Sequence, residues 1–96
     1  MTIEYKDLPQ VLSENDRAFF GILEATINSV DELSTLEVRK GPELYHFRIA
    51  TSSPSYISPL IAQLNELHNL FFIKVDFSKS IKSAASISYK IPLTFS

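Results

Sequence analysis

The chain has no cysteine, no tryptophan and only two glycines among its 96 residues. Without cysteine it forms neither a disulfide framework nor a zinc site built on thiolates. Two isolated glycines, Gly21 and Gly41, also exclude a glycine-rich loop that would hold a phosphate group. Because disulfides persist mainly in oxidising compartments, the missing cysteines favour a reducing one.

Long apolar runs are missing as well. No stretch approaches the ~18 consecutive apolar residues of a membrane span. Lys6 and Asp7 interrupt the N-terminus where a signal peptide would need its apolar segment. Together with the missing cysteines, this pattern predicts a cytoplasmic protein that does not bind membranes.

The net charge is only -2, but the two signs are unevenly distributed. Residues 1–44 carry nine acidic and four basic side chains, whereas residues 45–96 carry two acidic and five basic ones. Neither half is charged enough to indicate a nucleic-acid partner by itself. The opposite charges of the two halves can attract each other within one fold or between two copies.

Apolar residues are plentiful: 45% of the chain is hydrophobic and 11% aromatic, enough for one core. The clearest pattern covers residues 58–77. Ser58 and Pro59 are favoured types at a helix N-cap and first helical position, and apolar residues then recur at helical spacing around Leu64. From Phe71 to Phe77 every second residue is apolar, which predicts a strand directly after the helix.

Two other patterns precede this unit. Residues 2–6 alternate as a short strand or a docked arm would, and Pro9 ends the alternation. Ser13 is placed as the N-cap of an earlier helix, with Asp16 three residues later and an apolar stripe that includes Leu23. Gly21 lies within this stripe and is interpreted as a position of close packing.

Two strand patterns follow the first helix, and a third ends the chain. Residues 36–39 and 44–49 alternate on either side of Gly41, which predicts a hairpin whose turn depends on Gly41 if its φ is positive. The last alternation covers residues 87–95. Because Pro92 has no N–H for a ladder, this strand is expected at a sheet edge or with Pro92 outside the pairing.

These elements predict a single α+β domain over residues 1–96. Its order is α-β-β-α-β-β, and its two layers are a four-stranded, mainly antiparallel sheet and two helices that cover one face of it. This succession is similar, at the level of fold, to dimeric secretion chaperones and to several toxin-immunity and phage-encoded inhibitor proteins.

Catalytic and metal-binding patterns are weak. His46 and His68 lack the close spacing of paired metal ligands, and no serine lies in a G-x-S-x-G turn. We therefore expect no catalytic residue, no metal and no cofactor. His46 is expected on the mixed face of the hairpin, and His68 near a helix C-terminus where it satisfies late carbonyls.

The face of the sheet away from the helices is the candidate interaction surface. Two large apolar residues, Leu44 and Phe72, are out of phase with the core there, and such residues often mark a contact surface. The predicted members of this surface are Leu44, His46, Arg48, Phe72, Lys74 and Lys90.

Three classes of function are considered for this chain. The first is a noncatalytic protein-binding module that acts as a homodimer through an exposed sheet face or edge and serves as an adaptor, chaperone or inhibitor. The alternative is a small nucleic-acid-binding protein that uses the C-terminal lysines Lys74, Lys79, Lys82 and Lys90. The third is an enzyme with an unrecognised pocket. Salt is expected to separate the first two, because phosphate contacts weaken steeply as salt rises.

Overall fold

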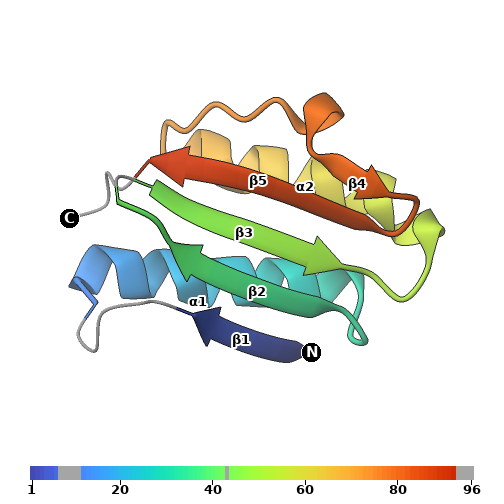
Figure 1. Cartoon of the computed structure of the whole chain (residues 1–96), viewed down its shortest axis with the longest axis horizontal. Coiled ribbons are helices and arrows are strands. Elements are labelled where there is room, and N and C mark those ends of the chain that lie inside the picture. The colour runs from blue at the N-terminus through green and yellow to red at the C-terminus, as the bar shows by residue number, and fades with distance from the viewer. Residues whose placement is uncertain (7–11, 43, 93–96) are drawn as a thin grey trace.

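The computed structural model describes residues 1–6, 12–42 and 44–92, without the side chain of Lys82. Two long helices and five strands make up the fold (Figure 1). Their bounds are β1 Thr2–Lys6, α1 Glu14–Val30, β2 Thr35–Lys40, β3 Leu44–Ala50, α2 Ile57–Leu70, β4 Ile81–Ser83 and β5 Ser86–Pro92.

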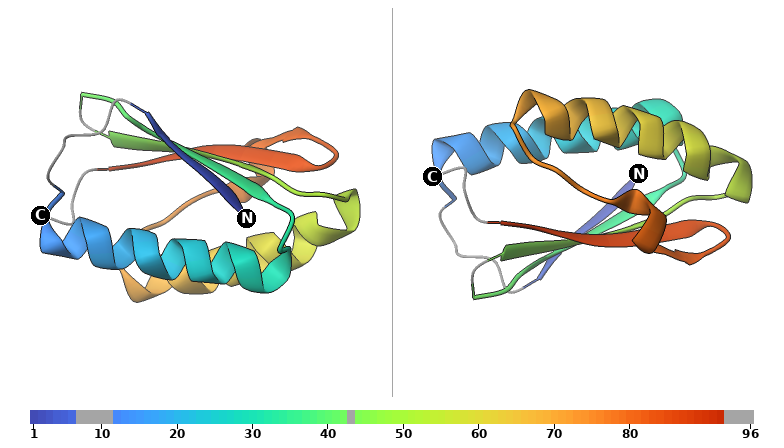
Figure 2. Two further views of the ribbon diagram at one scale, coloured as in Figure 1. Left: turned by 90° about the horizontal axis from the view of Figure 1, so that it is seen from below. Right: turned by 90° about the horizontal axis from the view of Figure 1, so that it is seen from above.

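Both helices lie on one face of a mixed sheet whose strand order is β1-β2-β3-β5-β4 (Figure 2). β4 has three residues and extends an otherwise four-stranded sheet. The predicted α+β class with two helices is confirmed. The predicted element order α-β-β-α-β-β and the mainly antiparallel sheet are wrong, because the chain begins with β1 and β1 pairs parallel with β2. This parallel pair forms because α1 carries the chain back along the sheet before β2 starts.

The first helix begins as predicted. The Ser13 hydroxyl accepts a hydrogen bond of 3.1 Å from the Asp16 N–H and caps α1. Asp16 is itself buried, and its Oδ2 accepts a 2.6 Å hydrogen bond from the Tyr45 hydroxyl, which connects α1 to β3. The interpretation of Gly21 is wrong: a Cβ at this exposed position would have no atom within 4 Å.

The second helix begins at Ile57, directly after a short 3-10 turn at Pro54–Tyr56. Ser58 and Pro59 therefore lie inside its first turn, not at its boundary. The predicted stripe is confirmed, since Leu60, Leu64 and Leu67 are buried. α2 packs beside α1 and runs in the opposite direction (Figure 2).

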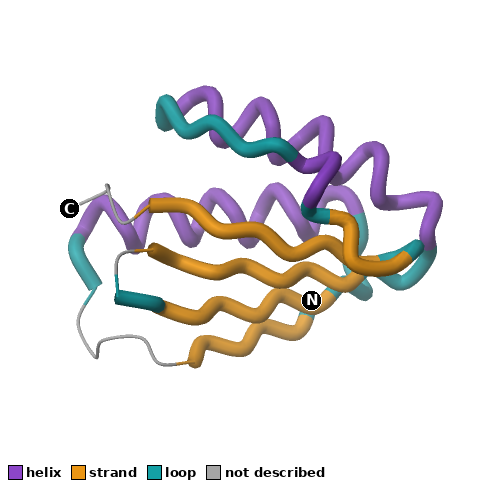
Figure 3. The backbone as a smooth tube through the Cα atoms, turned by 45° about the horizontal axis from the view of Figure 1, so that its top comes forward, coloured by secondary structure: helices purple, strands orange, loops and turns teal. Residues whose placement is uncertain are grey.

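The predicted strand at residues 71–77 is wrong. These residues leave the end of α2 and cross to the edge of the sheet without joining its ladder (Figures 2 and 3). The alternation of side chains is nevertheless present, because Ile73 and Phe77 are buried while Lys74 and Asp76 are exposed. Period two therefore describes an extended chain that lies against the core, whether or not its backbone pairs with a strand.

Phe72 occupies the position after α2 at which glycine is usually found. Its φ is 58°, and it is the only non-glycine residue with a positive φ in the described chain. The Phe72 N–H donates to the Asn69 carbonyl at 3.1 Å and the Ile73 N–H donates to the His68 carbonyl at 2.9 Å, which together form a Schellman motif. The side chain of Phe72 is 97% exposed, so no packing offsets the backbone strain.

We expect Phe72→Gly to raise the free energy of unfolding by about 1 kcal/mol, because glycine adopts a positive φ without the steric cost of a Cβ. Urea denaturation of Phe72→Gly and Phe72→Ala measures the effect. The alanine variant removes the same ring but keeps the Cβ, so it should stay within about 0.5 kcal/mol of the original protein. Equal stability of the two variants would contradict the assigned conformation.

The hairpin β2–β3 is confirmed, with Leu36 opposite Ile49 and Val38 opposite Phe47. The turn was expected to depend on Gly41 if its φ were positive. No glycine in the described chain has a positive φ, so the backbone conformation does not require glycine at this position. Its N–H donates to the Leu44 carbonyl at 2.7 Å and closes the turn.

The last strand, β5, lies between β3 and β4, and β4 covers only its first half. The Ser88 N–H points outward, since it donates to the Ser80 carbonyl at 2.8 Å. Pro92, four residues later, also directs its nitrogen away from β3 and toward the side that β4 leaves uncovered, so the predicted edge position holds for this half of β5. Pro9 and residues 93–95 of the predicted strand lie outside the described residues.

Candidate functional site on the open sheet face

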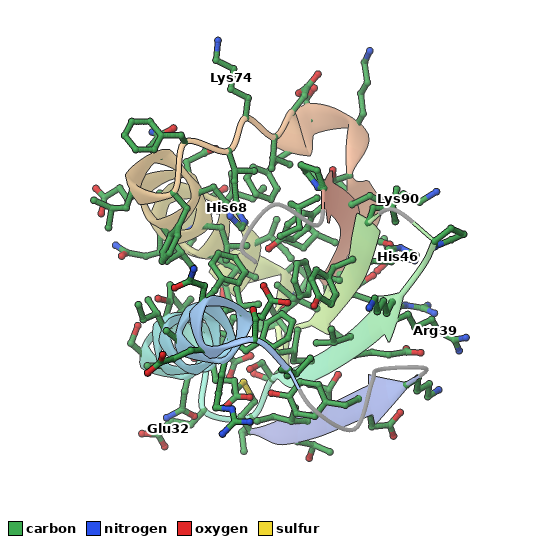
Figure 4. The ribbon with its side chains drawn as sticks, turned by 90° about the vertical axis from the view of Figure 1, so that its left-hand side faces the viewer. Glu32, Arg39, His46, His68, Lys74 and Lys90 are labelled. Carbon is green, nitrogen blue, oxygen red and sulfur yellow. The ribbon has the colours of Figure 1, made fainter. Side chains whose placement is uncertain are left out.

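The sheet face opposite the helices is lined by polar and charged side chains. Residues Val38, Phe47 and Tyr89 point into the core, so their neighbours along each strand point the other way. Figure 4 shows Arg39, His46 and Lys90 together on this side. We call this surface the open face, and its described members on the three central strands include Glu37, Arg39, Leu44, His46, Arg48, Ser88 and Lys90.

Four of the basic side chains form one row across the sheet. Lys6 on β1 is opposite Arg39 on β2, which is opposite His46 on β3, which is opposite Lys90 on β5. Neighbouring strands lie about 4.8 Å apart, so three permanent cations and one imidazole fall within about 15 Å. We call Lys6, Arg39, His46 and Lys90 the basic row.

Glu37 neutralises one end of this row. Its Oε1 lies 3.1 Å from Lys6 Nζ and 2.9 Å from Arg39 Nε. The hydrogen bond from Lys6, followed by that from Arg39, lowers the pKa of Glu37 below its ordinary value. In the part of the chain that the structure describes, Arg48 and Lys90 form no ion pair. The uncompensated positive charge therefore lies on the β3–β5 side of the open face.

His46 lies at the centre of the face and is half-buried. Its Nε2 lies 2.5 Å from Ser88 Oγ, across the β3–β5 pair. Three shallow hollows meet at this imidazole. One of them combines the apolar side chains of Pro42 and Leu44 with the cations of Arg39 and Lys90.

Four of the six predicted surface residues, Leu44, His46, Arg48 and Lys90, do lie together on this face. Lys74 lines a hollow at the edge of β5 with His46 and Lys90, although its amino group points away from the sheet (Figure 4). The placement of Phe72 is wrong, because residues 71–77 do not form a strand and Phe72 lies at the end of α2 instead.

The sequence prediction omitted the charged members Lys6, Glu37 and Arg39, as well as Glu4 and Ser88. The signal for Glu37 and Arg39 was present, since both alternate with the core residues Leu36 and Val38 in the predicted hairpin. Lys6 joins the face only because β1 pairs with β2, and this pairing connects residues about 33 positions apart in the chain.

His68 lies on the other side of the sheet, in the core between the helices and the sheet (Figure 4). Its expected role at helix carbonyls is wrong, because the side chain is buried and its Nε2 lies 2.9 Å from the Tyr89 hydroxyl. Burial lowers the pKa of His68 to about 4. The two histidines cannot share a ligand, and no three His, Asp or Glu side chains in the described residues are grouped as metal ligands would be.

Comparisons with protein-family models, curated protein sequences and solved structures found no match for this chain. Within the described ranges no helix is long and apolar enough to cross a membrane. The chemistry of the open face is therefore the guide to function. Guanidinium and ammonium groups on a sheet bind carboxylates or phosphates, and the guanidinium does so in a bidentate geometry.

Proposed function

We propose that this chain is a noncatalytic, cytoplasmic protein-binding module whose open face binds an acidic segment of a partner protein. The observation that carries the proposal is the basic row with Arg48 beside it, held on one face of the sheet. The cytoplasmic location is proposed from the sequence alone, chiefly from the absence of cysteine. Within this proposal the module serves as an adaptor, chaperone or inhibitor.

Charge favours an acidic partner. On the open face Lys6, Arg39, Arg48 and Lys90 outnumber the two carboxylates, Glu4 and Glu37. Because Glu37 already pairs with Lys6 and Arg39, an incoming carboxylate would find Arg48 and Lys90 available without breaking these contacts. Complementary charge both accelerates encounter and selects against basic partners.

The hollow at Leu44 favours a protein over a nucleic acid. Its apolar floor beside Arg39 and Lys90 suits an apolar side chain flanked by carboxylates. Sequence-tolerant binding of single strands needs aromatic rings for base stacking, and the described open face offers only the imidazole of His46. Lys79 lies on the 3-10 turn Phe77–Lys79 and not on a strand of the face, so Lys74, Lys79 and Lys90 do not form one track.

The same charges argue against a homodimer through this face. Two copies placed face to face would bring their basic rows together, and like charges in a desolvated contact are costly. A dimer through this face would also need an apolar contact, and of the two large apolar residues expected here, Leu44 and Phe72, Phe72 is not on the face.

The test uses two probes of equal charge: a peptide of alternating glutamate and leucine, and an oligothymidylate. We expect the peptide to shift the amide resonances of β3 and β5, and Arg48→Glu to weaken its binding about tenfold. The matched control is Arg17→Glu, the same change on α1, which covers the opposite face. Salt alone does not separate the classes, because both contacts are electrostatic.

Tighter binding of the oligothymidylate than of the peptide would favour the nucleic-acid alternative. If the two arginine variants weakened peptide binding equally, attraction to the overall charge would explain the binding and the open face would lose its role.

A further inference from the structure

β1 forms one edge of the sheet, and the backbone groups of two of its five residues pair with no strand of the described chain. The Thr2 N–H donates to the Ser34 carbonyl at 3.1 Å, so the N–H and C=O groups of Thr2, Glu4 and Lys6 point toward β2. The backbone groups of Ile3 and Tyr5 therefore point outward, and no described strand pairs with them. An open edge of this kind is a template for a further strand.

We propose that two copies of the chain pair through β1 as antiparallel strands, with Tyr5 of one copy opposite Tyr5 of the other. A two-fold axis at this position lets each outward Tyr5 N–H donate to the Tyr5 carbonyl of the second copy. The pairing forms at the β1 edge and needs no ligand on the open face, so the inference does not rest on the proposed function.

Charge selects this register. With Tyr5 opposite Tyr5, Glu4 of each copy lies opposite Lys6 of the other, on the open side of the sheet. These two pairs are at non-hydrogen-bonded positions, where opposing side chains approach most closely. A shift that places Ile3 opposite Tyr5 would instead put Glu4 opposite Glu4. Charged residues usually protect an edge strand from pairing, but the alternation of Glu4 and Lys6 is complementary to itself.

Tyr5 contributes an apolar contact on the other side of the sheet. Its ring is 45% exposed and lies 6.1 Å from the ring of Phe20 on α1. Pairing of the two edges would bring the two tyrosine rings together and cover them. It would also join the two open faces, because each basic row begins at Lys6 on β1.

Analytical ultracentrifugation over a concentration series tests the pairing. We expect the original protein to dimerise, and Glu4→Lys and Lys6→Glu each to weaken the dimer about tenfold, because each change places like charges at both symmetric positions. An equimolar mixture of the two variants should dimerise as tightly as the original protein, since opposite charges then meet at every position. Circular dichroism confirms that each variant is folded.

Phe72→Glu provides a control away from β1, since Phe72 follows the C-cap of α2 and α2 lies on the β5–β4 side of the sheet (Figure 1). It should leave the dimer unchanged. A monomeric original protein, a mixture that stays monomeric, or a dimer weakened only by Phe72→Glu would overturn the β1 pairing.

Discussion

Leu64→Ala is expected to lower the free energy of unfolding by about 2–5 kcal/mol. Leu64 is 0% exposed and lies at the centre of the buried stripe of α2. Truncation removes three buried carbon atoms and leaves a cavity, because the helix cannot move inward without displacing its neighbours. A domain of this size has a total stability of about 5–15 kcal/mol, so this single change removes a large part of it. Urea denaturation monitored by circular dichroism measures the loss.

The control makes the same substitution on the same helix. Leu70 is 76% exposed at the end of α2, so Leu70→Ala should change the free energy of unfolding by no more than about 0.5 kcal/mol. Similar losses for Leu64→Ala and Leu70→Ala would show that the inward face of α2 has been misassigned.

Local periodicity is why the helices and the hairpin were predictable. The stripe around Leu64 and the alternation of Leu36 and Val38 are each read within one element, and burial then follows from the period. The start of α2 was misplaced by two residues because Ser58 and Pro59 suit a boundary as well as a first turn. The preceding 3-10 turn at Pro54–Tyr56 shifted that boundary.

The error at residues 71–77 has a different cause. Alternate burial of Ile73 and Phe77 is shared by a strand and by any extended segment that lies on a core, so side-chain period cannot distinguish them. The left-handed backbone at Phe72 starts this segment in a direction that does not lead into the ladder. No propensity rule predicts phenylalanine there, because glycine is the favoured residue.

The candidate site was predictable only within single strands. Arg48 and His46 follow from the alternation of β3, and Lys90 from that of β5. The row that joins Lys6 to Lys90 depends on which strands are neighbours, and this is decided by contacts far apart in sequence. β1 supplies both Lys6 and the open edge. Its parallel pairing with β2 could not be predicted from local sequence patterns, because it joins residues far apart in the chain.

Acid is expected to destabilise the fold well above the pKa of ordinary carboxyl groups, and His68 is the reason. Its ring stacks between Phe19 and Phe77, with centroids 5.7 Å and 6.0 Å away. Nδ1 is buried and has no hydrogen-bond partner within the described residues, so a second proton would bring an unpaired charge into the core. Burial therefore lowers the pKa of His68 from 6.5 to about 4.

The sign of the effect follows from linkage. Between pH 6.5 and pH 4 the unfolded chain binds a proton at His68 and the folded chain does not, so acid favours unfolding. The loss begins as the pH falls toward 6.5 and is complete near pH 4. These pKa values correspond to about 2 kcal/mol between pH 7 and pH 5 and about 3 kcal/mol in full.

Urea denaturation of the original protein and of His68→Gln at pH 7 and pH 5 isolates this contribution. Glutamine retains an amide that can hydrogen-bond to the Tyr89 hydroxyl but does not titrate. Carboxyl groups with lowered pKa values, such as Asp31 and Asp76, are common to both proteins and lose their contribution at lower pH. We expect the original protein to lose about 2 kcal/mol more than His68→Gln over this interval. Equal losses in the two proteins would mean that His68 is protonated in the folded state or accessible to water.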